Sequence, residues 1–110
     1  MTATALEARV VTGSGMPVIE LVGDVDSRAE AALDTAYAEV ETADGVLLDF
    51  SEVTYMNSTG IALIVGLLAR ARKNGKTLSA RGLSEHYREI FEITRLADYM
   101  NIVDDEEGSA

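Results

Sequence analysis

The chain has 110 residues, of which 47% are hydrophobic, and its formal net charge is −10. This length predicts one domain with one hydrophobic core. Nucleic-acid phosphates and anionic lipids repel such a charge, so the composition argues against nucleic acid and membrane surfaces as partners and favours a basic protein. The chain has no Cys and only one His, His86. Disulfides, thiolate metal sites and poly-histidine metal sites are therefore excluded, and we expect His86 at the surface.

No signal for export or membrane insertion stands out. No apolar run reaches the roughly 20 residues of a membrane-spanning helix. Residues 1–7 lack the basic start and the apolar core of a signal peptide. We therefore expect a cytoplasmic protein, with one domain over residues 1–103 and an acidic, disordered tail over residues 104–110.

The first part of the chain predicts a hairpin and a helix. Leu6–Val11 and Pro17–Val22 are strand-like, and the short Gly-containing turn between them favours an antiparallel pair. Ser27 and Glu30 fit a capping box that opens a helix ending near Glu41. The predicted buried face of this helix consists of Ala29, Leu33, Ala36, Tyr37 and Val40.

The middle of the chain predicts a buried strand and then the longest helix. Val46–Phe50 is nearly all apolar, which is typical of an interior parallel strand. The helix that follows opens at Asn57 or Ser58, either of which can cap it, and runs to about Lys73. Gly75 is placed to end it in a left-handed conformation.

Helical periodicity divides this long helix into two faces. The predicted core stripe is Ile61, Ile64, Val65 and Leu68. The opposite side is predicted to carry Thr59, Leu63, Leu67 and Arg70. On this count, Leu63 and Leu67 are either an exposed ridge available to a partner or residues packed under a neighbouring loop.

The last part of the chain predicts a strand, a helix and a final short strand. Thr77–Ala80 and Asn101–Val103 are strand-like, Ser84 opens a helix, and Leu96–Met100 is a short turn or helical piece. The predicted buried stripe of this helix is Tyr87, Ile90, Phe91 and Thr94. The whole pattern predicts a single α/β domain with a mixed, mostly parallel sheet of four to five strands packed against helices.

Small polar residues stand at the start of the long helix, where Asn57, Ser58 and Thr59 precede Gly60. Unpaired backbone N–H groups and the positive end of the helix dipole lie at such a start. An added phosphate is stabilised there for the same reason. The residue types alone leave two alternatives open, helix capping and a functional site, and capping is their commoner use.

Acidic residues near strand ends suggest a competing hypothesis. Asp24, Asp26 and Asp49 invite comparison with a receiver domain, which phosphorylates itself on Asp with magnesium. A receiver also needs a Lys after its late strand, whereas Lys76 precedes the fourth strand. We therefore interpret Asp24 and Asp26 as turn and capping residues, and predict no catalytic residue, metal site or cofactor.

Several segments, in order, resemble a STAS domain, and in particular the stand-alone anti-sigma factor antagonists of bacteria. The resemblance extends from about Leu6 to Val103. The segments that carry it are Leu47–Val53, Met56–Ile61, Asn74–Lys76, Phe91–Leu96 and the acidic turn Gly23–Asp26.

The resemblance implies a binding protein that is not an enzyme. Its partner would be an anti-sigma factor, often also a serine kinase of the histidine-kinase-like ATPase fold, and binding would release a sigma factor. The kinase, which supplies ATP and magnesium, would phosphorylate Ser58, with Thr59 as the alternative, and a serine phosphatase would reset the switch. The partner-binding residues expected on this basis are Asp24, Asp26, Asn57, Ser58, Thr59, Gly60, Leu63 and Leu67.

The chain departs from the family pattern at Asn57, where Asp is usual. Asn retains a short side chain that can cap the helix, but it removes a negative charge beside the acceptor hydroxyl. This departure favours an alternative use of the same fold, as a scaffold or accessory module of a signalling or lipid-transport complex without a phosphorylation switch.

Overall fold

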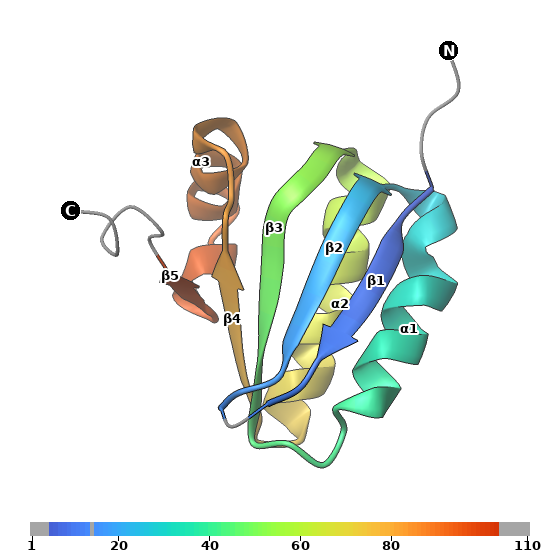
Figure 1. Cartoon of the computed structure of the whole chain (residues 1–110). Helices are drawn as coiled ribbons and strands as arrows, with labels where there is room; N and C mark the ends of the chain where they lie inside the picture. Colours follow the sequence, from blue (N-terminus) through green and yellow to red (C-terminus); the bar gives the residue numbers. More distant parts are fainter. Residues whose placement is uncertain (1–4, 14, 104–110) are drawn as a thin grey trace, which may run out of the picture.

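The computed structural model describes residues 5–13 and 15–103. The tail predicted over residues 104–110 lies outside them. Five strands form one sheet in the order β1-β2-β3-β4-β5, in which β1 and β2 are antiparallel and the other neighbours are parallel. Helices α1 and α2 lie behind the sheet, and α3 lies past the carboxyl end of β4 (Figure 1). The predicted α/β fold with a mixed, mostly parallel sheet is confirmed.

The elements follow the predicted order, with longer strands in two places. The strands are β1 Glu7–Val11, β2 Val18–Val25, β3 Gly45–Met56, β4 Thr77–Arg81 and β5 Asn101–Val103. The helices are α1 Glu30–Glu39, α2 Ser58–Lys73 and α3 Glu85–Ile93, with short 3-10 turns η1 Ser27–Ala29 and η2 Leu96–Asp98. The third strand extends past the predicted end at Phe50 because its polar second half pairs with the end of β2, up to Val25 beside Met56.

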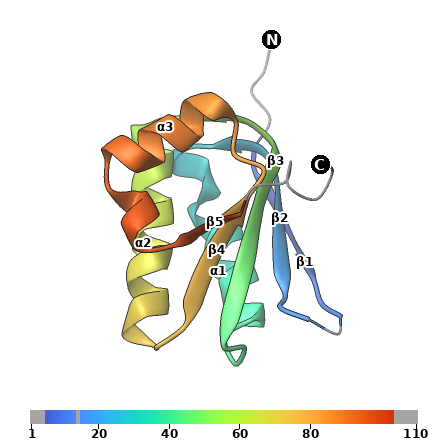
Figure 2. The same cartoon turned by 90° about the vertical axis from the view of Figure 1, so that its left-hand side faces the viewer.

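The core lies between the sheet and the helices. Alternate residues of the central strands point to the helices and are fully buried, including Ile19, Leu21 and Leu48. The α3 helix joins this core through Phe91, whose ring meets Phe50 edge-on at 5.9 Å between centroids. No described helix covers the other face of the sheet, as the turned view makes plain (Figure 2).

The α1 helix buries the predicted face but begins differently from the prediction. Ala29, Leu33, Ala36, Tyr37 and Val40 are all buried, as predicted. The predicted capping box of Ser27 and Glu30 is wrong. The chain first makes the η1 turn, and the Asp26 carboxylate accepts the Arg28 backbone N–H at 3.0 Å. The acid one residue earlier therefore takes the capping position.

The α2 helix is rotated from the predicted orientation. Ile64 and Leu68 are buried, and Thr59 and Arg70 are exposed, as predicted. However, Val65 is 42% exposed and Leu67 only 3% exposed. The inward face is Gly60, Ile64, Leu67, Leu68 and Ala71. Two of these residues are small, so a count of large apolar side chains misplaces the face.

The predicted end of α2 and the predicted start of α3 are confirmed, whereas the end of α3 differs from the prediction. Gly75 has φ +69°, so the left-handed end of α2 is confirmed. The Ser84 hydroxyl caps α3 by accepting the Tyr87 N–H at 3.3 Å, also as predicted. Thr94 is exposed rather than buried, since α3 ends there and its hydroxyl donates to the Ile90 carbonyl at 2.7 Å.

Lys76 is a buried cation that sequence patterns do not reveal. Its ammonium group donates to the carbonyls of Val40, at 3.3 Å, and Glu41, at 2.6 Å, and also to that of Ala43. These carbonyls follow the end of α1, where a positive charge is favoured by the helix dipole. Lys76 thus ties the end of α1 to the start of β4.

Candidate partner-binding and phosphorylation site

The start of α2 presents two hydroxyl side chains to solvent. Asn57 is the cap, with extended backbone angles (φ −102°, ψ −178°) and a side-chain oxygen that accepts the Gly60 N–H at 2.8 Å. The alternative cap, Ser58, lies in the first turn, and both Ser58 and Thr59 are exposed. Because Asn57 supplies the cap, the helix does not need the Ser58 hydroxyl for that purpose.

The end of β2 holds this start of the helix in place. The Asn57 N–H donates to the Val25 carbonyl at 3.3 Å. A Cβ atom added to Gly60 would lie 1.8 Å from that same carbonyl oxygen, far inside van der Waals contact. Only glycine allows the first turn of α2 to sit this close to β2.

A tyrosine from α3 holds the residue before the cap. The Tyr87 hydroxyl accepts the Met56 N–H at 2.9 Å and lies 3.4 Å from the Met56 carbonyl, to which it can donate. Met56 ends β3 beyond the last residue that pairs with β4, Asp49. The hydroxyl therefore bonds backbone groups of Met56 with which β4 does not pair. Together with Val25, it fixes the backbone on which Ser58 is displayed.

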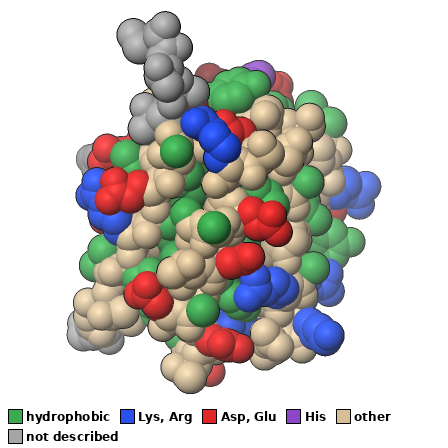
Figure 3. Space-filling view, turned by 90° about the vertical axis from the view of Figure 1, so that its right-hand side faces the viewer, with side chains coloured by type: hydrophobic (Ala, Val, Ile, Leu, Met, Phe, Trp, Pro, Cys, Tyr) green, Lys and Arg blue, Asp and Glu red, His purple; other side chains and the backbone are tan. Residues whose placement is uncertain are grey.

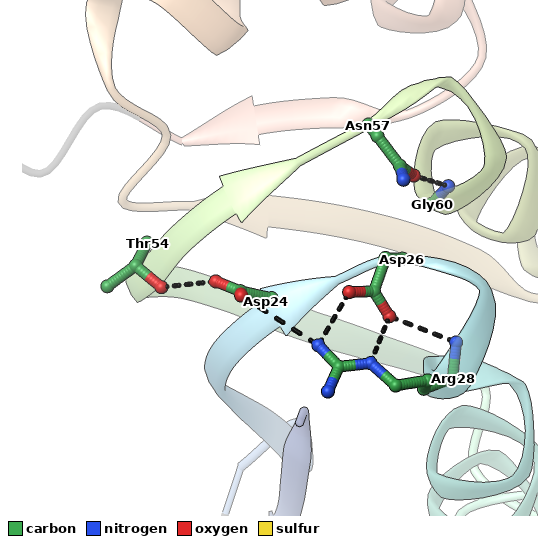
Figure 4. A network of polar contacts seen from close by, with 6 residues as sticks. All are labelled: Asp24, Asp26, Arg28, Thr54, Asn57 and Gly60. Carbon is green, nitrogen blue, oxygen red and sulfur yellow. Dashed lines mark hydrogen bonds and ion pairs between the residues drawn. The ribbon is translucent and has the colours of Figure 1, made fainter. Parts of the chain in front are cut away.

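The acidic turn after β2 is held by an arginine and a threonine. Asp24 is 8% exposed and accepts the Thr54 hydroxyl at 2.7 Å. The Arg28 guanidinium binds both oxygens of Asp26, at 2.7 and 3.0 Å, and lies 3.9 Å from Asp24 (Figure 4). Hydrogen bonds from the Arg28 side chain and backbone lower the pKa of Asp26 from its usual 3.8.

The predicted site residues are thus brought together only in part. Asp24, Asp26 and Asn57 lie on adjoining segments because Val25 binds Asn57. The Asp24 side chain, however, points towards Thr54 and Arg28 rather than towards Asn57 (Figure 4). Arg28 offsets part of the negative charge that the sequence suggests for this turn.

Leu63 and Leu67 do not form the exposed ridge that one of the sequence hypotheses described. Leu67 is buried and Leu63 is half-buried, because α2 turns this side towards α1. Both line a groove of about 260 Å³ between α1 and α2. The other lining residues are Glu30, Leu33, Asp34, Ala62, Gly66 and Arg70.

A family model described as "Mlab, STAS domain" matches residues 8–104. The chain belongs to the STAS domain family.

Relatives of this STAS domain include proteins named as anti-sigma factor antagonists. The anti-sigma-B factor antagonist of Listeria monocytogenes is 33% identical over 86 residues, which cover 76% of this chain and 75% of the relative. An anti-sigma-factor antagonist domain protein from Planctomyces limnophilus has a similar structure, with a TM-score of 0.72, 20% identity and coverage of 97% and 96%. The Bacillus cell fate determinant SpoIIAA, solved in its phosphorylated form, gives a TM-score of 0.61 at 23% identity, with coverage of 94% and 96%.

The third acid of the receiver hypothesis is a structural group in this STAS domain. Asp49 accepts hydrogen bonds from the Ser51 hydroxyl at 2.6 Å, the Ser51 N–H at 2.9 Å and Arg81 at 2.9 Å. Burial raises the pKa of Asp49, but these hydrogen bonds and the Arg81 charge outweigh burial and lower it overall. Within residues 5–13 and 15–103, no group of three or more His, Cys, Asp or Glu is arranged to hold a metal ion.

None of the helices in the described part of the chain is long and apolar enough to span a membrane. Acidic, basic and hydrophobic side chains are interspersed over the face on which α1 lies (Figure 3). His86 is exposed, as predicted, with its ring 4.9 Å from that of Tyr87.

Sequence reasoning did not identify Arg28, Thr54 and Tyr87 as residues that hold the site in place. Arg28 follows Asp24 and Asp26 by four and two residues, and this local charge spacing could have suggested the ion pairs. Thr54 and Tyr87 are 30 and 31 residues from the groups that they bind. Only the folded arrangement of β2, β3 and α3 reveals their roles.

Proposed function

We propose that this STAS domain is an anti-sigma factor antagonist: it binds an anti-sigma factor and so releases a sigma factor. The observation that carries the proposal is the exposed Ser58, held on a fixed backbone at the start of α2 in a domain whose named relatives are antagonists of this kind. The partner we propose is an anti-sigma factor that is also a serine kinase of the histidine-kinase-like ATPase fold. The domain itself is a cytoplasmic binding protein without catalytic residues or a cofactor.

We propose Ser58 as the phosphorylation site, with Thr59 as the alternative. The Ser58 oxygen would form a bond to the γ-phosphorus of ATP. The bond between that phosphorus and the β–γ bridging oxygen would break, so that ADP leaves. The serine proton would pass to a base of the kinase, which also holds the magnesium. A serine phosphatase would later hydrolyse the phosphoserine with water, which releases inorganic phosphate and restores the free hydroxyl.

The phosphate would act at the surface and leave the fold intact. It adds about −1.5 to −2 charges and three acceptor oxygens. The positive end of the α2 dipole favours this charge, and Asn57 and Val25 hold the helix start independently of Ser58. A partner packed over Ser58 would have to desolvate the phosphate, and a partner without a compensating cation would lose about 2–4 kcal/mol of binding free energy.

The remaining predicted contact residues surround Ser58 at different depths. Thr59 and Asn57 are the immediate neighbours at the surface, while Gly60 acts by allowing close packing on Val25. Asp24 and Asp26 provide a turn held by Arg28, and we propose that the partner contacts this turn as one unit. Leu63 belongs to the same surface through the groove, with Leu67 at its floor.

A scaffold that never becomes phosphorylated is the second candidate. Asn57 favours it, because the usual Asp and its charge beside the acceptor serine are absent. Such a domain would bind its partner constitutively, within a signalling or lipid-transport complex.

Co-purification from the native cytoplasm, followed by phosphorylation of the retained pair, separates these candidates. The wild-type chain should retain an anti-sigma factor of the kinase class. Addition of ATP and magnesium should then place one phosphate on Ser58, located by mass spectrometry, and Ser58→Ala should bind without accepting it. A phosphate on Thr59 alone would move the site by one residue. Retention of a transporter ATPase, with no phosphate formed, would contradict the antagonist proposal.

A further inference from the structure

Gly66 has no structural reason to be glycine. It lies in the middle of α2, where glycine destabilises a helix relative to alanine. A Cβ atom added there would meet nothing within 4 Å, in contrast to Gly60. The residue is exposed, and its φ is not positive. The fold would therefore accept a larger residue at this position.

Gly66 lies on the wall of the groove between α1 and α2. Ala62 stands one turn before it on the same wall, and Leu33 and Leu67 are buried beneath. Ala62 is also four residues, or one turn, after Ser58. The groove thus begins one helical turn from the proposed phosphorylation site, and a partner that covers Ser58 is in a position to reach it.

The exposed side of α2 beside this groove is uncharged. No Asp, Glu, Lys or Arg occurs from Ser58 to Ala69, although 25% of the residues of the whole chain are charged. The exposed residues of this stretch are Ser58, Thr59, Ala62, Val65, Gly66 and Ala69. An exposed helix face without charge is typical of an interaction surface, and of these six residues only Ala62 and Gly66 line the groove.

The charged residues of the groove lie at its rim, and their pairing differs between the two ends. Glu30, in the first turn of α1, is exposed and makes no ion pair with another described residue. At the far end, Asp34 is already paired with Arg70 at 2.9 Å, and Arg70 also stacks on Tyr37. The acid available to a partner is therefore at the Glu30 end.

We propose that this groove receives an amphipathic helix of the anti-sigma factor, with a bulky apolar side chain seated against Gly66 and a Lys or Arg facing Glu30. This inference rests on the proposed function, whose partner it describes in more detail. A helix fits better than an extended strand, because both walls are helices whose backbone groups are already bonded internally. From Ala62 to Arg70 the wall is about 12 Å long, or roughly two turns of an entering helix.

The test compares binding of the anti-sigma factor retained by the wild-type chain, measured by calorimetry, across two matched pairs of variants. Gly66→Leu fills the groove, whereas Ala69→Leu adds a similar side chain to the same helix outside the lining. Glu30→Lys reverses the rim charge, whereas Glu39→Lys makes the same change at the exposed far end of α1. Thermal unfolding establishes that all four variants fold.

Gly66→Leu should weaken binding at least about tenfold relative to Ala69→Leu. Glu30→Lys should weaken binding more than Glu39→Lys does, and the difference should shrink as salt rises. A loss from Gly66→Leu no greater than that from Ala69→Leu would overturn the proposal. So would a wild-type dimer that Gly66→Leu dissociates, since the occupant would then be a second copy.

The same variants separate this inference from the proposed function. If the retained protein is not an anti-sigma factor, the proposed function fails, and the partner named for the groove is wrong with it. If an anti-sigma factor is retained and Ser58→Asp weakens its binding while Gly66→Leu does not, the function stands and the groove proposal alone is overturned.

Discussion

The two glycines of α2 should respond to alanine in opposite directions. At Gly66 the new methyl group meets nothing within 4 Å, so the gain in helix propensity remains. Gly66→Ala should therefore raise the free energy of unfolding by about 0.5–1 kcal/mol. At Gly60 the methyl carbon would lie 1.8 Å from the Val25 carbonyl oxygen, well below the 3.0 Å limit of real Cβ contacts.

A backbone atom cannot rotate away from such a clash, so the first turn of α2 must move off β2. That movement weakens the hydrogen bond from the Asn57 N–H to Val25 and loosens the packing below it. Overpacking of this kind typically costs about 1–3 kcal/mol. We expect Gly60→Ala to fall at the upper end of that range, because the whole helix start has to shift.

Urea unfolding followed by helical circular dichroism measures both variants against the wild-type chain. The midpoint should fall for Gly60→Ala and rise for Gly66→Ala, with similar slopes. If Gly60→Ala proved as stable as Gly66→Ala, the start of α2 would not be seated on Val25, and the account of how Ser58 is held would be wrong.

The remaining predictions concern the core, the sheet and the cap. Ile64→Ala should cost about 2–5 kcal/mol of unfolding free energy. Val65→Ala should cost less than about 1 kcal/mol, because the Val65 side chain is 42% exposed. Equal costs in urea unfolding would show that both side chains are buried, as the sequence predicted, and would contradict the observed orientation of α2. Hydrogen bonds hold the pKa of Asp49 below 3.8, so its stabilising contribution is present above that pH and is lost as the pH falls through the lower folded value. Asp49→Asn should flatten this acid limb of stability against pH, and an unchanged limb would refute the assignment. Asn57→Ala should lose about 0.5–2 kcal/mol of unfolding free energy, whereas Asn57→Asp should keep the cap, and equal effects would exclude the capping role.

The order and type of the elements were predictable because large apolar residues dominate the periodicity. The α1 face was predicted completely, since every residue from Ala29 to Val40 that the spacing selected is buried. The α2 face was not. Gly60 and Ala71 are buried through small size and close approach, while Val65, which is large and apolar, stays outside. Hydrophobic periodicity ranks positions by their side chains, so it does not detect a small residue that is buried by close backbone contact.

The exposure of the hydroxyl residues at the start of α2 was predictable, but the contacts that hold this segment were not. Ser58 and Thr59 are exposed where the family resemblance places a phosphorylated serine. The contacts that fix this segment join residues distant in sequence, such as Tyr87 with Met56 and Thr54 with Asp24. Polar pairs of this kind carry no periodic signal, so they emerge only from the paths of the strands.

The dissociation constant of the anti-sigma factor complex, compared between the chain with phosphate on Ser58 and the chain without it, tests the central claim most directly. A loss of about 2–4 kcal/mol predicts that phosphorylation weakens the affinity by roughly thirtyfold to a thousandfold. Ser58→Asp should reproduce part of that loss. Equal dissociation constants for the two forms would contradict the account, because Ser58 would then lie outside the surface that the partner covers.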